Sequence, residues 1–403
     1  MSSLVFDTMA FLIVVSLTAS AVVLMLLVGV LAVELIAMLV AGSDREAPAP
    51  DATGSYVIVI PAHNEVGTIE HTLAAVLDDA TGQGHVLVVA DNCTDRTAAV
   101  ARSAGATVIV RQDPLRRGKG YALDFAVRHL EIDPPDVVIV LDADCIPEPG
   151  ALRQIFAACR YSNRPVQARY EMTTPAPDTG TLARVGAFAW RVRNVARPKG
   201  LAALGVPCLL MGTGMAFPWP TLSRTCLETG HLVEDMVLGL DLAARGEGAR
   251  FFPEACVRGT LPPSREGQTS QRTRWETGHL QVIRHSLAPL LIRALARADY
   301  RMLVLALHAL VPPLALLALL LLAVAVANGL VALAGGPSLG FEIAAWAACI
   351  AGTVFATYWF KMGRDILSRR ELLQLPAYVV SKLSIYARAM SGRPIEWIRS
   401  KRD

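Results

Sequence analysis

Residues 137–144 read VVIVLDAD, a short apolar run that ends in two aspartates. The run itself, Val137–Leu141, has the length and the valine and isoleucine content of a buried strand. Three earlier stretches share this composition, and each also leads into polar residues: Tyr56–Ile60, Val86–Ala90 and Thr107–Val110. Helical patterns lie between these stretches: Thr68–Leu77, Thr94–Ala104 and Gly120–Leu130. Strands that are apolar on both faces and alternate with helices are typical of a parallel sheet, so the pattern predicts an α/β fold.

On both sides of this region the chain of 403 residues is apolar, with 53% hydrophobic and 18% charged residues overall. Three runs contain no charged residue: Thr8–Val33, Met302–Phe341 and Ile343–Phe360. About 20 apolar helical residues are enough to cross a bilayer core of about 30 Å. The composition therefore excludes a wholly soluble protein and a disordered one. It predicts an integral membrane protein, with a buried globular hairpin as the alternative for the later runs.

We expect three membrane-spanning helices. One lies at residues 8–41, where Glu34 would reach toward the membrane interface near the helix end. The segment 302–361 holds two more, at roughly 302–327 and 341–361, and the prolines at 312 and 313 should bend the first of them.

Basic residues predict the orientation of these helices. From Lys361 to Asp403, ten basic and four acidic residues leave a net charge of +6, whereas the whole chain carries +3. Positively charged segments stay in the cytoplasm. We therefore expect the central domain and the basic tail, residues 362–403, to face the cytoplasm from the inner membrane. Two amphipathic segments, 279–298 and Leu372–Met390, should lie in the headgroup plane, with packing on the soluble domain as the alternative.

Polar residues follow each expected strand, at the edge where parallel sheets bind ligands. The four clusters are PAHNE (61–65), DNCTD (91–95), RRGKG (116–120) and DAD (142–144). Each cluster alone could be a helix cap or a surface turn, but four at successive strand ends indicate a binding site. Asp142 and Asp144 are hard oxygen ligands that suit Mg²⁺ or Mn²⁺, and Lys119 could balance the charge of a diphosphate from the opposite side. The clusters therefore indicate binding of a nucleotide diphosphate.

Three further motifs follow along the chain: MGTGM (211–215), VED (233–235) and QRTRW (271–275). The paired glycines of the first let the backbone approach a ligand closely. The adjacent carboxylates of the second could cap a helix or act as a general base. The third is a weak signal when taken alone.

In this order, the seven motifs resemble those of membrane-embedded family 2 glycosyltransferases, the group that contains cellulose, hyaluronan and poly-N-acetylglucosamine synthases. The resemblance covers about residues 56–276, within an expected glycosyltransferase domain at 52–276, and extends to the apolar helices on both sides. It implies an α/β domain of the Rossmann-like GT-A fold, flanked by transmembrane and interfacial helices. It also implies an inverting enzyme that moves a sugar from a nucleotide-sugar donor, expected to be a UDP-sugar, to a growing polysaccharide in exopolysaccharide biosynthesis.

The resemblance implies a role for each matching residue. Asp235 would be the catalytic base, with Glu234 beside it, and Asp144 would hold Mg²⁺ or Mn²⁺ together with Asp142. The other residues would bind substrates: Ala62, His63 and Glu65 at the nucleoside, Asp91 at the uracil, Lys119 and Asp142 at the diphosphate, Gly212 and Thr213 under the acceptor terminus, and Gln271, Arg274 and Trp275 at the diphosphate and the acceptor sugar.

The alternative function is a single transfer to a lipid or lipid-linked acceptor. A non-catalytic binding subunit is disfavoured because every expected carboxylate is present, and the VED and QRTRW pair disfavours a nucleotidyltransferase. The expected partners are the donor, a saccharide or lipid-linked acceptor and the bilayer, and we expect no nucleic acid. Three spans are few for a secretion channel, which leaves open a homo-oligomer or an export partner.

Overall fold

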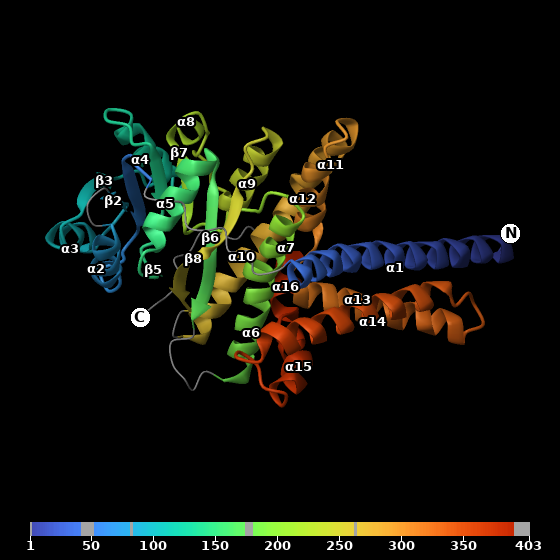
Figure 1. The fold of residues 1–403 in the computed structure, drawn as a ribbon. Helices are drawn as coiled ribbons and strands as arrows, with labels where there is room; N and C mark the ends of the chain where they lie inside the picture. The colour runs from blue at the N-terminus through green and yellow to red at the C-terminus, as the bar shows by residue number, and fades with distance from the viewer. Residues whose placement is uncertain (1, 42–51, 81–83, 174–179, 262–263, 391–403) are drawn as a thin grey trace.

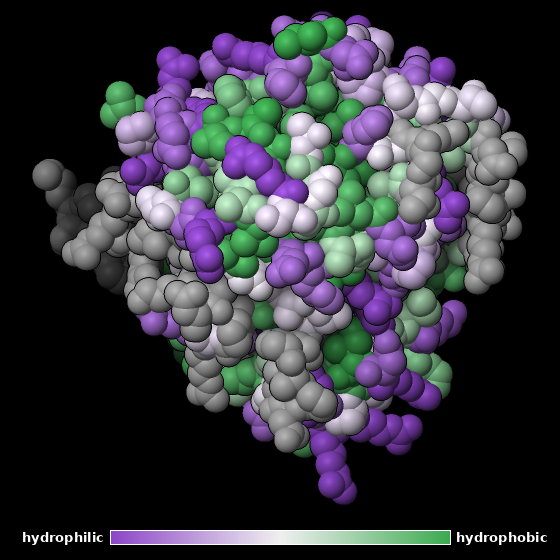
Figure 2. Space-filling view, turned by 90° about the vertical axis from the view of Figure 1, so that its left-hand side faces the viewer, coloured by the Kyte–Doolittle hydropathy of each residue, from purple (hydrophilic) through white to green (hydrophobic). Residues whose placement is uncertain are grey.

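The computed structural model describes residues 2–41, 52–80, 84–173, 180–261 and 264–390. Figure 1 shows an α/β domain at one end of the molecule and three long helices that run side by side away from it. These helices are α1 (Ser2–Val40), α13 (Leu314–Leu333) and α14 (Leu339–Tyr358). Seen from the end opposite these helices, the α/β domain presents hydrophilic side chains interspersed with hydrophobic ones (Figure 2).

An eight-stranded mixed sheet forms the centre of the α/β domain and confirms the predicted fold class. Its strands, in spatial order, are β3 (Thr107–Arg111), β2 (Gly84–Asp91), β1 (Tyr56–Ala62), β4 (Val137–Val140), β7 (Met215–Pro218), β6 (Val166–Thr173), β8 (Arg250–Thr260) and β5 (Cys145–Pro147). The first four are parallel and coincide with the four strands expected from the sequence. Their carboxyl ends therefore meet at one edge of the sheet.

The second half of the sheet was not predicted. Strand β7 is antiparallel to β4 and β6, while β6 and β8 are parallel. Strand β6 is difficult to recognise because polar residues interrupt its apolar pattern, and Gln167 is one of them. This side chain is fully buried, and it donates to the Thr213 carbonyl (2.9 Å) and accepts from the Met211 N–H (2.8 Å). Gln167 thus fixes the MGTGM loop from below.

Alternating strand residues pack against helices on the two faces of the sheet. Tyr56, Ile58 and Ile60 belong to a core with α2 (Ile69–Asp79), α3 (Thr97–Ser103) and α5 (Ala151–Ser162). Val57 and Val59 face α4 (Lys119–Leu130), α8 (Trp219–Leu222) and α9 (Glu234–Ala244). Because both faces are covered, the strands read as continuous apolar runs.

A group of helices joins the α/β domain to the three long helices (Figure 1). It comprises α6 (Thr181–Arg191), the π-helical segment η1 (Val192–Ala196), α7 (Arg197–Ala203), α10 (Arg265–His285), α11 (Leu287–Ala296) and α12 (Tyr300–Leu310). The expected single helix over 279–298 is instead divided between α10 and α11. Pro289 has no N–H to donate to the carbonyl of His285, so α10 ends at His285 and a new helix begins.

Among the described residues, three helices are long and apolar enough to cross a membrane: Thr8–Val40, Leu314–Leu333 and Leu339–Gly363. Large apolar side chains on α1, such as Phe11 and Leu26, are exposed on the protein surface, as expected for contact with lipid. The number of spans agrees with the prediction, but the bent helix over 302–327 does not form. The prolines at 312 and 313 end α12 at Leu310 and α13 begins at Leu314, so residues 302–310 belong to a separate, shorter helix.

The C-terminal segment folds back onto the joining helices. After the π-helical end of the third span, η2 (Trp359–Gly363), it forms η3 (Glu371–Gln374), α15 (Leu375–Ser381) and α16 (Leu383–Met390). Lys382 is buried and forms an ion pair with Glu276 of α10. The expected continuous amphipathic helix is therefore divided, and part of it packs on the protein. Residues 42–51 and residues 391–403 of the predicted basic tail lie outside the described residues.

Glu34 does not reach toward the interface as expected. Its side chain is 1% exposed and accepts from Arg197 Nε at 2.5 Å and from His308 Nδ1 at 2.8 Å. Arg197 Nη2 also donates to the His308 carbonyl at 2.9 Å. The backbone of α1 meets Gly200 of α7 so closely that a Cβ atom there would collide with the Glu34 carbonyl. A buried polar network therefore fastens the first apolar helix to α7 and α12.

Candidate active site

A cleft of about 270 Å³ opens at the carboxyl ends of β1, β2 and β4 and extends to the joining helices. The strand-end motifs contribute Ala62, His63, Glu65, Asp91, Lys119, Asp142 and Asp144 to its lining. The later motifs contribute Gly212, Glu234, Asp235, Gln271, Arg274 and Trp275. The structure thus gathers every predicted site residue except Thr213 around one cavity.

The end of the cleft where we expect the nucleoside is built from the loops after β1 and β2. His63 Nδ1 lies 2.7 Å from the Asp91 carbonyl, and since a carbonyl only accepts, Nδ1 is the donor. The Asp91 carboxylate accepts from Arg111 Nη1 at 2.7 Å, and both side chains are largely buried. Asn64 adopts φ 54° and its Oδ1 accepts from the Thr94 N–H at 2.8 Å, which ties the two loops together. These hydrogen bonds hold the two loops together, so they form a fixed wall at this end of the cleft.

The carboxylates of the DAD motif lie on the side of the cleft after β4. Ligand atoms of Asp142, Asp144 and Cys145 are all within 4.8 Å of one another. The Asp142 N–H donates to Thr213 Oγ1 at 3.1 Å, and Thr213 is fully buried. Thr213 therefore supports the metal-binding candidate from behind and does not itself line the cleft, while its expected place under the acceptor terminus stays a prediction.

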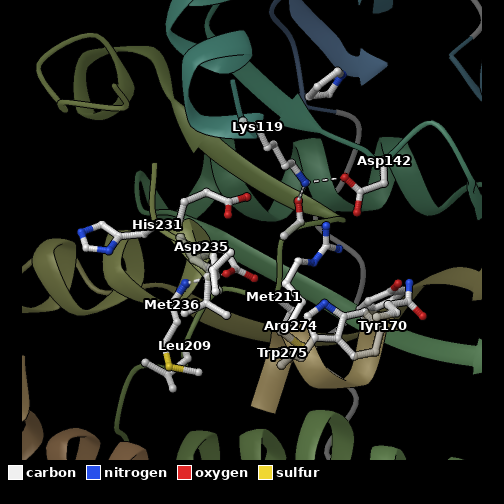
Figure 3. A pocket seen from close by; sticks show the side chains of 18 of the residues that line it. Lys119, Asp142, Tyr170, Leu209, Met211, His231, Asp235, Met236, Arg274 and Trp275 are labelled. Atoms are coloured by element: carbon white, nitrogen blue, oxygen red, sulfur yellow. Dashed lines mark hydrogen bonds and ion pairs between the residues drawn. The ribbon is translucent and has the colours of Figure 1, made fainter. Parts of the chain in front are cut away.

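Lys119 connects the DAD motif to the glycine-rich loop. Its ammonium donates to the Asp142 carboxylate and to the Gly212 carbonyl, the latter at 2.6 Å (Figure 3). Burial disfavours the charged lysine, but the carboxylates of Asp142 and Glu234 outweigh this effect and raise its pKa. Lys119 consequently keeps its positive charge in the cleft. The adjacent Gly120 has no room for a side chain, because a Cβ atom would lie 2.5 Å from the Leu227 carbonyl oxygen.

The two carboxylates of the VED motif begin α9 and face the same loop. A Cβ atom on Gly212 would lie 3.3 Å from Asp235 Oδ2 and 3.5 Å from Lys119 Nζ, so a larger residue would intrude between the base candidate and the lysine. Gly212 also has φ 87°, which favours glycine. Burial and the neighbouring Asp235 raise the pKa of Glu234 to about 7. Burial likewise raises the pKa of Asp235, as a general base near neutral pH requires.

Arg274 and Trp275 of α10 face the same opening as Lys119 and Asp142 (Figure 3). The Trp275 ring lies 4.8 Å from the ring of Trp190 at 40°. Trp190 in turn donates from Nε1 to the Tyr170 carbonyl at 3.2 Å and meets the Tyr170 ring edge-on at 5.2 Å. The three rings form an aromatic wall in the cleft.

Residues 52–278, more than half of the chain, match the model of the glycosyltransferase-like family 2. The chain belongs to this family. The matched segment contains all seven motifs and ends within α10, three residues after QRTRW.

Two sequence relatives of this family 2 chain bear the names of glycosyltransferases. It is 26% identical over 249 residues to the probable glycosyltransferase YdaM of Bacillus subtilis, covering 57% of this chain and 56% of that one. It is 37% identical over 98 residues to the low-salt glycan biosynthesis hexosyltransferase Agl6 of Haloferax volcanii, covering 24% of this chain and 22% of that one. The chain thus spans about half of the first relative's length and much less of the second's.

The family 2 chain also resembles a solved structure over nearly its whole length. This is the mannosyltransferase PcManGT from Pyrobaculum calidifontis, solved in complex with GDP-Man and Mn²⁺. The TM-score is 0.56 with 20% identity, and the match covers 96% of this chain and 100% of that one. The likeness supports the GT-A fold class together with the flanking helices.

The motifs of the family 2 chain did not reveal the part of the cleft formed by β6, α6, η1 and α7. Five residues of these elements line the cleft but belong to no recognised motif: Tyr170, Trp190, Arg193, Asn194 and Arg197. Trp190 and Arg193 are spaced like ordinary residues of an amphipathic helix, which gives no sign of a site. Their role becomes visible only through their partners on distant elements.

Proposed function

We propose that the protein is an inverting glycosyltransferase that moves a sugar from a nucleotide-sugar to a growing polysaccharide at a membrane. The proposal rests chiefly on one observation. The candidate base Asp235 lies in the same cleft as Lys119, Asp142 and Asp144, with the aromatic wall around Trp275 beside them. A donor diphosphate and an acceptor hydroxyl can therefore be held on opposite sides of one reacting carbon.

The donor side fits a nucleoside diphosphate with Mg²⁺ or Mn²⁺. Asp142 and Asp144 supply carboxylate oxygens, which these cations prefer. Burial, with Asp144 nearby, raises the pKa of the Cys145 thiol well above its usual range. Hard cations prefer oxygen to sulfur ligands, so the two carboxylates are the expected ligands. A cation held there would neutralise charge on the departing diphosphate. The expected donor is a UDP-sugar, and the GDP-Man complex of PcManGT is a reason to test GDP-sugars as well.

The transfer step follows from the position of Asp235. Its carboxylate takes the proton of an acceptor hydroxyl, whose oxygen bonds to the anomeric carbon while the bond from that carbon to the diphosphate oxygen breaks. Lys119 and Arg274 place positive charge beside the departing diphosphate, which stabilises the transition state. Because attack comes from the face opposite the leaving group, the configuration at the anomeric carbon inverts.

A single transfer to a lipid-linked acceptor is the second candidate. It is favoured by the course of the cleft, whose far end is lined by Arg197, His308 and Ala309. Arg197 and His308 bind Glu34 of the first apolar helix, so this end lies at the boundary of the candidate membrane spans. An acceptor anchored in the bilayer could enter there. The net charge of +6 from Lys361 to Asp403 supports an inner-membrane protein with its catalytic domain in the cytoplasm.

The test uses the full chain in lipid nanodiscs with UDP-glucose, UDP-N-acetylglucosamine and GDP-mannose. Release of nucleoside diphosphate is measured with and without oligosaccharide and lipid-linked acceptors, and the products are analysed by mass. We expect release that depends on an acceptor and on Mg²⁺ or Mn²⁺, with a product ladder for a polymerase and one added sugar for a single transfer. Absence of donor binding, or release that no acceptor increases, would contradict the proposed function.

A further inference from the structure

The C-terminal segment, residues 359–390, contacts both of the helices that carry the aromatic wall. Its helix α15 lies beside α6, which holds Trp190, and its helix α16 lies beside α10, which holds Trp275 (Figure 1). The transfer step uses no residue of this segment, and no described residue of it lines the cleft. The contacts of the segment with these two helices therefore point to a role other than binding substrate.

Two ion pairs join the segment to α6. Glu371 of η3 accepts from Arg184 near the start of the helix. Asp365 accepts from Arg191 Nη1 at the end of the helix, at a distance of 2.6 Å. Exposed ion pairs contribute little, and the Asp365 side chain is 60% exposed whereas that of Glu371 is 13% exposed. Glu371 is therefore the stronger attachment on this side.

The backbone of the segment also packs directly on α6. Gly363 has so little room that a Cβ atom there would lie 2.5 Å from the ring of Phe188. This ring lies 5.7 Å from that of Tyr358 at the end of α14, and both side chains are buried. Phe188 and Trp190 are two positions apart on the same helix. A displacement of the segment would therefore displace the helix that carries Trp190.

A buried ion pair joins the segment to α10. Lys382 lies between α15 and α16, and its ammonium donates to the carboxylate of Glu276. The two side chains are 3% and 12% exposed. The ammonium also lies 5.4 Å from the centre of the Tyr378 ring, within the range of a cation–π contact. Since Glu276 directly follows Trp275, the second tryptophan of the wall is attached to the same segment as the first.

We infer that the C-terminal segment is a clamp that holds Trp190 and Trp275 against each other, with Glu371 and Lys382 as its positioning residues. The two rings are 4.8 Å apart although they belong to helices that are distant in the chain. The consequence for catalysis rests on the proposed function. If Trp275 contacts the acceptor, opening the clamp impairs transfer to the acceptor and leaves binding of the donor intact.

Two changes open the clamp, one on each side. Glu371→Gln removes the charge that holds Arg184. Glu276→Gln combined with Lys382→Met removes both charges of the buried pair, so that no buried charge is left without a partner. Replacing both members of a buried pair with uncharged residues of similar size is often neutral for stability, so this double variant is expected to fold.

Glu247→Gln is the matched control for Glu371→Gln. It breaks an ion pair with Arg224 that is also partly exposed, and neither residue of that pair lines the cleft. A charge exchange tests the pair itself. Arg184→Glu combined with Glu371→Arg restores the attraction with reversed polarity, so it should recover what Glu371→Gln loses.

Each variant is measured as the full chain in lipid nanodiscs, with the three nucleotide-sugars as donors and cellotetraose, mannotetraose, chitotetraose or farnesyl phosphate as acceptor. The donor Kd and the acceptor-dependent rate are determined separately. Circular dichroism reports on the wall directly, because two indole rings this close couple their absorption. The signal of the pair is the difference between spectra recorded with and without Trp275→Phe in each background.

We expect each opened clamp to lower the acceptor-dependent rate at least about tenfold, equivalent to about 1.4 kcal/mol, with the donor Kd unchanged. The circular dichroism of the ring pair should weaken in the same variants and return with the charge exchange. The control should match the wild type in all three quantities. A merely structural role of the segment would lower the thermal midpoint and the donor affinity together, and would leave the signal of the pair intact in the folded protein.

The inference fails if both opened clamps keep the wild-type signal of the ring pair, or if they weaken donor binding as much as they lower the rate. A wild-type protein that binds none of the three donors would instead contradict the proposed function. In that case, or if no acceptor supports transfer, the circular dichroism alone decides whether the clamp exists, which keeps the two failures separate.

Discussion

The ring of Trp275 lies 4.8 Å from that of Trp190 at a tilt of 40°, and Trp190 is itself held by a hydrogen bond from Nε1 to the Tyr170 carbonyl. The aromatic residue of the QRTRW motif is therefore not an isolated side chain on α10. Its position is set by α6 and β6 across the cleft, so the ring is already in place for the proposed contact with an acceptor.

Trp275→Ala should impair transfer to the acceptor far more than binding of the donor. Loss of one aromatic stack, taken as about 1–3 kcal/mol by analogy with base stacking, corresponds to about a 5–150-fold lower acceptor-dependent rate. The comparison is between donor Kd and acceptor-dependent rate in the same nanodiscs. Trp346→Ala is the control, because Trp346 is exposed on α14 and lies outside the cleft. Equal losses in both quantities would leave Trp275 as ordinary packing.

Asp235→Asn should reduce turnover at least about 10²-fold while donor affinity stays within a few-fold of wild type, because the amide keeps the shape but cannot take a proton. Single-turnover rates and donor titrations measure the two quantities separately. Asp241→Asn, an exposed change on the same helix α9, should have little effect. Turnover of Asp235→Asn within tenfold of wild type would reject Asp235 as the base.

The rate should depend on pH around neutrality. Burial raises the pKa of Asp235, and burial with Asp235 nearby raises that of Glu234 to about 7, while the charges of Lys119, Asp142 and Arg193 also act on the pair. A base must be deprotonated, and the pKa of Asp235 is raised, so the acid limb of kcat/KM should lie above the ordinary aspartate range of about 4. Glu234→Gln removes the carboxyl whose pKa is about 7, so a change of rate around neutrality should disappear while the acid limb of Asp235 remains. A wild-type acid limb at about pH 4 would contradict this assignment.

Asp144→Ala should abolish the part of donor affinity that depends on Mg²⁺ or Mn²⁺, since one of the few carboxylate ligands is lost. Isothermal titration with donor, at increasing Mn²⁺, measures this dependence. Asp133→Ala provides the control. Asp133 is exposed on a loop before β4 and, unlike the aspartates of the DAD motif, does not line the cleft. Donor affinity that still rises with Mn²⁺ as in wild type would exclude Asp144 as a ligand.

Glu34→Gln should destabilise the protein by about 3–5 kcal/mol, because it leaves the buried guanidinium of Arg197 without its counter-charge. The double variant with Arg197→Gln should recover part of this loss. Thermal unfolding in nanodiscs gives the comparison, with Glu342→Gln as an exposed control on α14. If Glu34→Gln and Glu342→Gln shift the midpoint equally, the buried pair contributes nothing measurable.

The first half of the site was predictable because each of its residues follows a strand whose period and composition are distinctive. Asp91, Asp142 and Lys119 are examples, and parallel strands bring their ends together without any knowledge of the rest of the fold. Trp190 could not be found in this way. It lies on a helix, and only its contacts with α10 and β6 show that it belongs to the cleft.

The helix boundaries near the membrane were less predictable for a related reason. Hydropathy joins residues 302–327 into one span, and the sequence does not decide whether Pro312 and Pro313 bend that helix, as expected, or divide it, as observed. Glu34 was misjudged because its partners are on α7 and α12. The sequence around a carboxylate at the end of an apolar run does not show whether an arginine far along the chain will form an ion pair with it.

The separation of Glu34 from its partners constrains how the protein is made. Arg197 lies 163 residues after Glu34 in the chain, and His308 lies 274 residues after Glu34. At about 5–20 residues per second, a ribosome needs on the order of ten seconds or more to supply the arginine. The first helix thus enters the bilayer with an acidic group that has no counter-ion, and it can dock only after the segment from η1 to α7 has emerged and folded. Correct assembly of the enzyme is therefore a late event in translation, and a chain that stalls before Arg197 would leave an unpaired acidic helix for membrane quality control.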